Sequence, residues 1–282
     1  MGDIVRRKWM TMMDVHAGVI ERVYGGPVGL IWEMLAGEET ERETGDLAKR
    51  AGIGKGSRVL ALLPGTGGAA RRLSRDYGPT VIGLVPVPQM VEEAVRMTEA
   101  AGLVARVDFQ QGNAIEMSFH DGIFDAVWGE DAWCYVVDRD RMIRETYRVL
   151  KPGGALAFTD WVQTGPMSED EWYTPETFGI FPHLETVESY ANVLERNGFA
   201  VTGRGEVPGD PARRVRGLRE SLRQGRDSII GLIGEEACDD ARAGLALWEK
   251  AAGRGLVGRG WLLARKPQGR SGYSGSEDFR QG

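Results

Sequence analysis

The chain has 282 residues, a length that suits one large domain with additions or two small ones. Hydrophobic residues make up 42% of it and charged residues 27%, which is typical of a soluble globular protein. The formal net charge of −6 argues against an electrostatic nucleic-acid surface, so we interpret the basic run from Arg213 to Arg226 as a solvated helix face and not as a binding patch.

The two cysteines, Cys134 and Cys238, are too few for a disulfide framework and match no metal-ligand spacing. The sequence has no apolar run of about 20 residues, and its first residues lack the apolar core of a signal peptide. We therefore expect a cytoplasmic protein with no bound metal and with neither a membrane nor a nucleic acid as partner. The oligomeric state stays open.

Residues 1–52 precede the first expected strand and have helical spacing of apolar residues. An apolar strand is then predicted over Val59–Leu63, and Pro64 ends it. A glycine-rich turn follows, and a helix over Ala69–Tyr77, from which Arg71 and Arg72 are expected to face outward. A buried strand, a glycine turn and a helix start form the first unit of a doubly wound nucleotide-binding domain.

Strands and helices alternate along the rest of the chain, which predicts an α/β fold with parallel strands joined by right-handed crossovers. A mostly helical insertion is expected over residues 210–252, and a disordered tail over 268–282. Further strands are predicted over residues 80–85, 104–110, 126–128, 155–160, 199–206 and 261–265, and helices over 90–101, 138–150 and 186–197.

Three stretches carry a family resemblance. Residues 59–68 are V-L-A-L-L-P-G-T-G-G, 124–128 are F-D-A-V-W, and 148–154 are R-V-L-K-P-G-G. The chain resembles class I S-adenosylmethionine-dependent methyltransferases over residues 20–267. Its sequence motifs are most similar to those of the small-molecule enzymes of the sarcosine/dimethylglycine and ubiquinone-biosynthesis groups. The resemblance implies a Rossmann-like domain over 53–267 whose last two strands form an antiparallel pair. It also implies an N-terminal lid over 1–52, for which a helix packed on the sheet edge is the alternative.

The family's cofactor motif is altered here. Where the family has V-L-D-L-G-C-G-T-G-G, this chain has Ala61 for the acid, Leu63 for the first glycine and Pro64 for the small residue. The acid that meets the ribose is replaced by Val85, and the acid that meets the adenine by Asn113. The resemblance thus assigns cofactor contact to Gly65, Gly67, Gly68, Val85 and Asn113.

The lost polar contacts predict that affinity for S-adenosylmethionine falls by a factor of about 10² to 10⁴. The alternative is ordinary sequence drift with compensation elsewhere. If S-adenosylmethionine no longer fits, another one-carbon carrier such as a reduced folate could stack on tryptophans.

Polar and aromatic residues gather where the fourth and fifth strands should end, the edge at which open α/β sheets bind ligands. Acids there could hold a cation or act as a general base, and aromatic faces suit a cationic amine or a flat heterocycle. The alternatives are solvated loop acids and core aromatics. The catalytic candidates are Glu130, Asp131 and Asp160, and the substrate-binding candidates are Trp128, Trp133, Tyr135 and Trp161.

Trp172 and Tyr173 are further aromatic candidates for the mouth of the site, and His120 and His183 are weaker acid–base candidates. These features together predict an enzyme that transfers a methyl group to a small molecule. Two other functions stay open. The fold could serve non-methyl chemistry such as a cyclisation or an elimination, or it could belong to a binding protein without catalysis.

Overall fold

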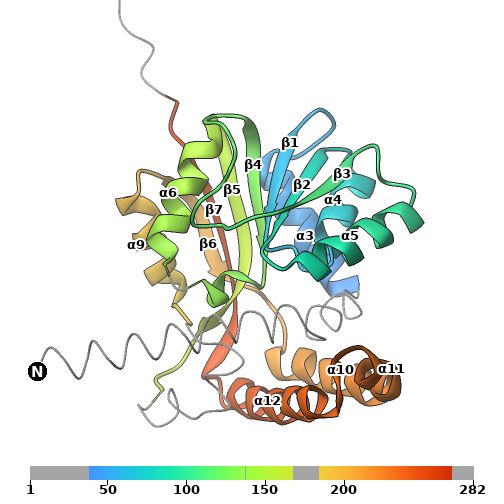
Figure 1. The fold of residues 1–282 in the computed structure, drawn as a ribbon. Helices are drawn as coiled ribbons and strands as arrows, with labels where there is room; N and C mark the ends of the chain where they lie inside the picture. The colour runs from blue at the N-terminus through green and yellow to red at the C-terminus, as the bar shows by residue number, and fades with distance from the viewer. Residues whose placement is uncertain (1–37, 137, 168–183, 269–282) are drawn as a thin grey trace, which may run out of the picture.

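A computed structural model describes residues 38–136, 138–167 and 184–268, which form a seven-stranded sheet in the order β3-β2-β1-β4-β5-β7-β6 (Figure 1). The five strands from β1 to β5 pair in parallel, whereas β7 is antiparallel to both β5 and β6. The predicted doubly wound α/β fold and its closing antiparallel pair are thereby confirmed. The strands are β1 (Arg58–Leu62), β2 (Thr80–Val85), β3 (Val107–Gln111), β4 (Phe124–Glu130), β5 (Leu150–Gln163), β6 (Ala200–Glu206) and β7 (Val257–Arg265).

Helices cover both faces of this sheet. In Figure 1, α3, α4 and α5 lie to one side of the strands, and α6 and α9 lie to the other. A short 3-10 helix, η2 (Trp133–Tyr135), follows β4. The helices are α3 (Glu38–Ala51), α4 (Gly68–Tyr77), α5 (Pro88–Ala100), α6 (Arg139–Val149), α9 (Val187–Arg196), α10 (Pro211–Gln224), α11 (Arg226–Ile233) and α12 (Glu235–Gly253).

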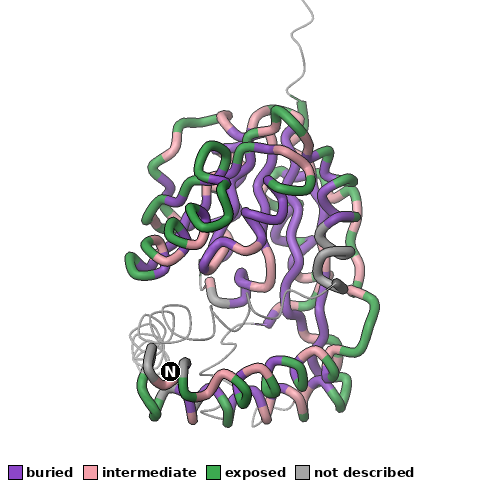
Figure 2. Tube along the Cα trace, turned by 90° about the vertical axis from the view of Figure 1, so that its right-hand side faces the viewer, coloured by how far each residue is buried: buried purple, intermediate pink, exposed green. Residues whose placement is uncertain are grey.

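The central strands are apolar along their length because helices bury both of their faces. In β1 every residue after Arg58 is buried, and in β5 the nine residues from Gly154 to Val162 are buried. Figure 2 shows this as a continuous buried centre wrapped by helices of mixed exposure. These mostly apolar runs are the pattern from which the strands were predicted.

One predicted strand begins later than expected. The strand predicted from residue 104 starts at Val107, because Gly102 adopts a left-handed φ of 69° and the chain is still turning there. Val104 is 59% exposed in this turn. An apolar residue beside the strand was mistaken for part of it.

The connection from β6 to β7 contains α10, α11 and α12, which lie below the strands in Figure 1. This is the edge at which the parallel strands end, because the C-terminal end of β5 pairs with the start of β7 beside α12. The predicted insertion is therefore helical and lies at the edge where the parallel strands end. Of the lid expected over residues 1–52, the part over 1–37 lies outside the described residues, as does 269–282 of the expected tail. The predicted domain boundaries stay predictions.

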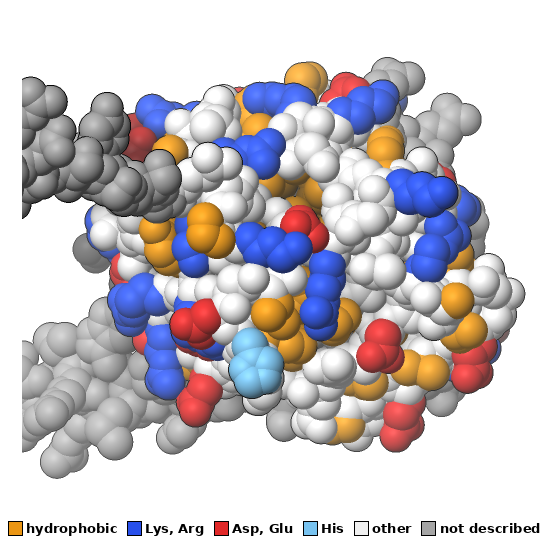
Figure 3. Space-filling model, turned by 90° about the horizontal axis from the view of Figure 1, so that it is seen from above, with side chains coloured by type: hydrophobic (Ala, Val, Ile, Leu, Met, Phe, Trp, Pro, Cys, Tyr) orange, Lys and Arg blue, Asp and Glu red, His pale blue; other side chains and the backbone are white. Residues whose placement is uncertain are grey.

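The opposite edge, where the parallel strands begin, is seen from above in Figure 3 and carries interspersed basic and acidic side chains. His120 lies exposed in the β3–β4 connection, away from the edge where the strands end. No helix within the described ranges combines the length and the apolar character that crossing a bilayer requires.

Candidate functional site

The turn between β1 and α4 lies beside the point where the strand order reverses, since β1 pairs with β2 on one side and β4 on the other. Gly65 and Gly67 have left-handed φ angles of 59° and 92°, and Gly68 begins α4. A Cβ at Gly67 would lie 2.2 Å from the Phe109 ring, so this glycine serves the protein's own packing. At Gly65 the nearest atom to such a Cβ is the Met90 Cε at 3.9 Å. Gly65 is thus the position where a ligand can approach the backbone.

Leu63 and Asp131 are the two non-glycine residues with positive φ in the described parts of the chain, at 54° and 52°. Leu63 follows β1 and Asp131 follows β4, so both lie at the carboxyl ends of the two strands that flank the reversal. A left-handed conformation costs an ordinary residue about 1–2 kcal/mol. Strain of this kind concentrates at functional sites.

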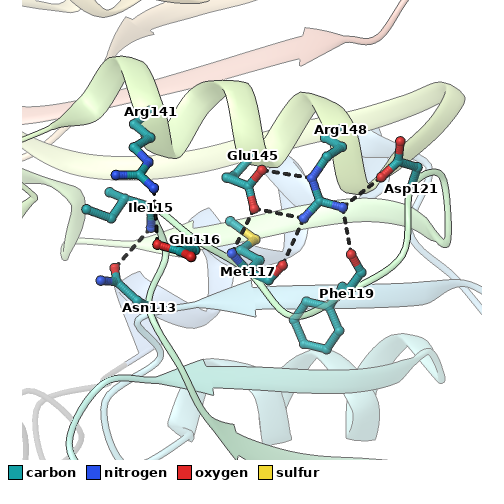
Figure 4. Close-up of polar contacts among 9 residues, drawn as sticks. All are labelled: Asn113, Ile115, Glu116, Met117, Phe119, Asp121, Arg141, Glu145 and Arg148. Atoms are coloured by element: carbon teal, nitrogen blue, oxygen red, sulfur yellow. Dashed lines mark hydrogen bonds and ion pairs between the residues drawn. The ribbon is translucent and has the colours of Figure 1, made fainter.

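Two of the three positions at which the family's cofactor acids are replaced, Val85 and Asn113, differ in their surroundings. Val85 ends β2 and is fully buried, and its side chain offers no hydrogen-bond acceptor. Asn113 Oδ1 accepts a hydrogen bond from the backbone N–H of Ile115 at 3.0 Å (Figure 4). The Asn113 side chain therefore closes a local turn after β3.

The R-V-L-K-P-G-G stretch over residues 148–154 places Arg148 against the β3–β4 connection (Figure 4). Its Nη1 donates to the Phe119 carbonyl oxygen at 2.6 Å and its Nη2 to that of Met117 at 2.9 Å. Glu145 pairs with Arg148 at 2.7 Å and accepts from the Met117 N–H at 2.7 Å. Arg148 thus fixes the loop that carries Asn113.

Arg71 and Arg72 were expected to face outward, and that prediction is wrong: each is 8% exposed. Arg71 Nη1 donates to the Thr66 carbonyl oxygen at 2.7 Å and so holds the glycine turn from beneath. Burial, with the neighbouring charge of Arg72, lowers the pKa of Arg71 to about 10. Arg72 pairs with Glu130 at 2.7 Å across the reversal point. Their acceptors lie in a turn and on another strand, which helical periodicity cannot reveal.

Glu130 has both carboxylate oxygens engaged. Oε2 accepts from Arg72, and Oε1 accepts from the Trp128 indole N–H at 2.9 Å. Trp128 is 1% exposed. The hydrogen bonds from Arg72 and Trp128 to Glu130 therefore stabilise the end of β4.

Asp131 is held by two arginines from distant parts of the chain. Arg259 of β7 donates to its Oδ1 at 3.0 Å, and Arg214 of α10 lies 3.6 Å from its Oδ2. The Thr159 hydroxyl also donates to Oδ1. Burial disfavours the charged form, but the two arginine charges outweigh it and hold the pKa of Asp131 below its usual value. Asp131 therefore stays ionised and anchors α10 to the sheet.

Asp160, in β5, differs from the other two acids. It is fully buried, its Oδ2 accepts from the Tyr190 hydroxyl, and its Oδ1 has no hydrogen-bond partner among the described residues. Burial, with a smaller contribution from the charge of Asp131, raises the pKa of Asp160 to about 7 against the opposing effects of Tyr190, Arg139 and Cys134. A carboxyl group that titrates near neutrality with an oxygen to spare can accept or donate a proton.

The predicted tryptophans Trp128, Trp133 and Trp161 are buried. Trp133 stacks on Phe158 with ring centroids 4.1 Å apart, and its indole N–H has no partner within the described part of the chain. Trp161 meets Trp248 of α12 edge to face at 5.3 Å. Tyr135 belongs to η2, and its side chain is outside the described part, as are the whole residues Trp172, Tyr173 and His183. Substrate contact by these residues stays a prediction.

Four residues that interact with Asp131 or Asp160 were not predicted from the sequence. They are Tyr190, Arg139, Arg214 and Arg259. Arg259 left a signal, since an arginine within the apolar run of β7 must find a buried partner. Tyr190 lies on the buried face of α9 and is indistinguishable in sequence from a core aromatic.

S-adenosylmethionine fits one part of this edge and not another. The open backbone at Gly65 and the start of α4 suit a polar group pressed against the turn. The ribose hydroxyls would meet Val85, which cannot accept their hydrogen bonds. No group of three or more potential metal-ligand side chains is assembled anywhere in the described residues.

Comparison with known proteins gives one family match and many relatives. Residues 60–158 match the family described as "Methyltransferase domain". A glycine/sarcosine/dimethylglycine N-methyltransferase of Actinopolyspora halophila is 30% identical over 80% of this chain, and the chain spans 40% of that relative's length. A solved structure described as the [4+2]-cyclase SpnF is 30% identical with a TM-score of 0.71, and 81% of each chain is covered.

The fold is also that of the phosphoethanolamine N-methyltransferase 2 of Haemonchus contortus, solved in complex with S-adenosyl-L-methionine. The TM-score is 0.73 at 22% identity, over 90% of this chain and 60% of that one. At this identity the likeness is one of fold alone.

Proposed function

Because this chain belongs to the class I S-adenosylmethionine-dependent methyltransferase superfamily, we propose that it transfers a methyl group to a small molecule at the carboxyl edge of its sheet. The observation that carries the location is the pair of strained residues, Leu63 and Asp131, at the ends of β1 and β4. Open α/β sheets bind ligands where the strand order reverses. Two left-handed non-glycine residues at that point support a site there.

We propose Asp160 as the proton acceptor. The Glu130 oxygens are engaged by Arg72 and Trp128, and the Asp131 oxygens by Arg259 and Arg214. Asp160 Oδ1, by contrast, has no hydrogen-bond partner among the described residues. The small molecule would carry an O–H or N–H group. That bond breaks, the proton passes to Asp160 Oδ1, and the electron pair stays on the acceptor atom as the nucleophile.

We propose S-adenosylmethionine as the methyl donor, bound weakly because Val85 replaces the ribose acceptor. When bound, it would supply an electrophilic methyl group. A reduced folate has less support, because Trp128, Trp133 and Trp161 are at most 1% exposed and present no open ring face for stacking.

Calorimetric titration with S-adenosylmethionine and S-adenosylhomocysteine tests the donor. We expect saturable, weak binding of both. Tight binding would contradict the weakened ribose site. No heat at millimolar ligand, confirmed by an unchanged melting temperature, would overturn methyl transfer from this donor.

A second function is non-methyl chemistry on the same scaffold, such as a cyclisation. Two observations favour it. The chain is similar to the cyclase over 81% of both chains, and Val85 stands where the family has the acid that accepts the ribose hydrogen bonds. A small-molecule acceptor panel separates the two functions. Product with a mass gain of one methyl group supports transfer, whereas product of unchanged mass supports cyclisation.

A further inference from the structure

The two oxygens of the Asp160 carboxyl group have different surroundings. Tyr190 of α9 donates to Oδ2, and Oδ1 on the other side of the group has no partner within the described ranges. Both residues are at most 1% exposed. A buried acid with one hydrogen-bonded oxygen and one oxygen without such a bond has two inequivalent positions for a proton.

We propose that Tyr190 is a positioning residue, which binds Oδ2 of Asp160 and thereby sets Oδ1 as the oxygen that exchanges a proton with the small molecule. This rests on the proposed function. Tyr190 itself touches neither donor nor acceptor in this account, and it acts through Asp160.

The Tyr190 ring is fixed on several sides, so its hydroxyl has one direction available. The ring meets Phe158 edge to face at 5.2 Å, and the Arg139 guanidinium lies over it at 5.6 Å from its centroid. Arg139 is in turn paired with Glu185 at 3.2 Å. A tyrosine placed only to fill the core would not need its hydroxyl directed at a buried acid.

The side chains that influence the pKa of Asp160 come from four parts of the chain. Tyr190 is on α9, Arg139 on α6, Cys134 in η2, and Asp131 after β4. Burial and Asp131 raise the pKa of Asp160, while the Tyr190 hydrogen bond, Arg139 and the Cys134 hydrogen bond lower it. Burial also raises the pKa of Tyr190, so the phenol stays protonated and remains a donor. Removing the hydroxyl should move the titration of Asp160 to higher pH.

The test is an infrared titration of the Asp160 carboxyl in the full chain without ligand, with the Asp160→Asn spectrum subtracted to isolate its signal. We expect a wild-type midpoint near 7. Tyr190→Phe should raise the midpoint by about one unit, the scale of a hydrogen bond to a charged group. Tyr147→Phe, which removes a hydroxyl from a half-buried tyrosine on α6, should leave it unchanged.

An unchanged midpoint in folded Tyr190→Phe protein would overturn the proposal. If this variant does not fold, labelling with 3-fluorotyrosine gives the second measurement. Its more acidic phenol is a stronger donor, so the midpoint should move to lower pH, and no movement would contradict the proposal. Neither titration uses donor or acceptor, so a failure of the methyl-transfer proposal is seen separately.

Discussion

Leu63 occupies a backbone conformation that suits glycine. The free-energy cost of this conformation can be measured by comparing substitutions at this position. At φ 54° an L-residue is strained, so a glycine should be more stable there than an alanine. We expect the free energy of unfolding of the Leu63→Gly variant to be about 1 kcal/mol higher than that of Leu63→Ala. Urea denaturation measures this difference.

Leu62 provides the matched control. It lies in β1, is equally buried and has ordinary strand geometry, so glycine should be worse than alanine there by about 0.5–1 kcal/mol. The opposite orders at neighbouring positions would establish the strain. Alanine equal to or better than glycine at both positions would contradict it.

Asp160 gives stability a distinctive pH dependence. The acid ionises near pH 4 in the unfolded chain but at about 7 in the folded protein, so between these values the folded state holds the extra proton. Stability from this group is therefore present below pH 4 and falls as pH rises to 7. The span of about three units corresponds to at most about 4 kcal/mol.

Denaturation of wild type and Asp160→Asn from pH 5 to 8 measures this directly. Asparagine cannot titrate, so we expect wild type to lose stability relative to the variant across this range and then to level off. Parallel profiles would show that Asp160 is already ionised in the folded protein at low pH.

At the scale of elements, the loop between β3 and β4 depends on Arg148 of α6. Lysine cannot make the several bonds of the guanidinium to the Met117 and Phe119 carbonyl oxygens and to Glu145. We expect Arg148→Lys to speed amide hydrogen exchange over residues 112–123 and to cost about 1–2 kcal/mol.

The control for Arg148 is Arg144→Lys, an exposed arginine on the same helix. It should leave exchange in this loop unchanged. Equal exchange in both variants and wild type would mean that the loop is held by its apolar residues instead.

The strands and most helices were predictable because they carry a local pattern of apolar residues, and many of them end at or next to a glycine or proline. The polar pairings were not. Asp131 and Arg259 are 128 residues apart, and Arg72 and Glu130 are 58 apart, so their pairing depends on the finished sheet. The sequence therefore predicted that acids gather at the carboxyl edge, but not that two of them are committed to arginines.

At the scale of the whole molecule, the sheet keeps the methyltransferase strand order while its nucleoside end is altered. The glycine turn keeps its left-handed backbone even where Leu63 replaces a glycine, and β2 still ends beside β1 in register. Val85 is fully buried at that end. We propose that this scaffold binds the ribose weakly.

The most direct test of this account is calorimetric titration of S-adenosylmethionine into wild type, Val85→Asp, Val85→Asn and Val85→Ile, with folding checked by circular dichroism. Restoring a carboxylate should strengthen binding about 10- to 100-fold, because charge-assisted hydrogen bonds are worth about 1.5–3 kcal/mol. The account predicts the affinity order Asp above Asn, with wild type and Ile equal and weakest. Equal affinity in wild type and folded Val85→Asp protein would contradict it.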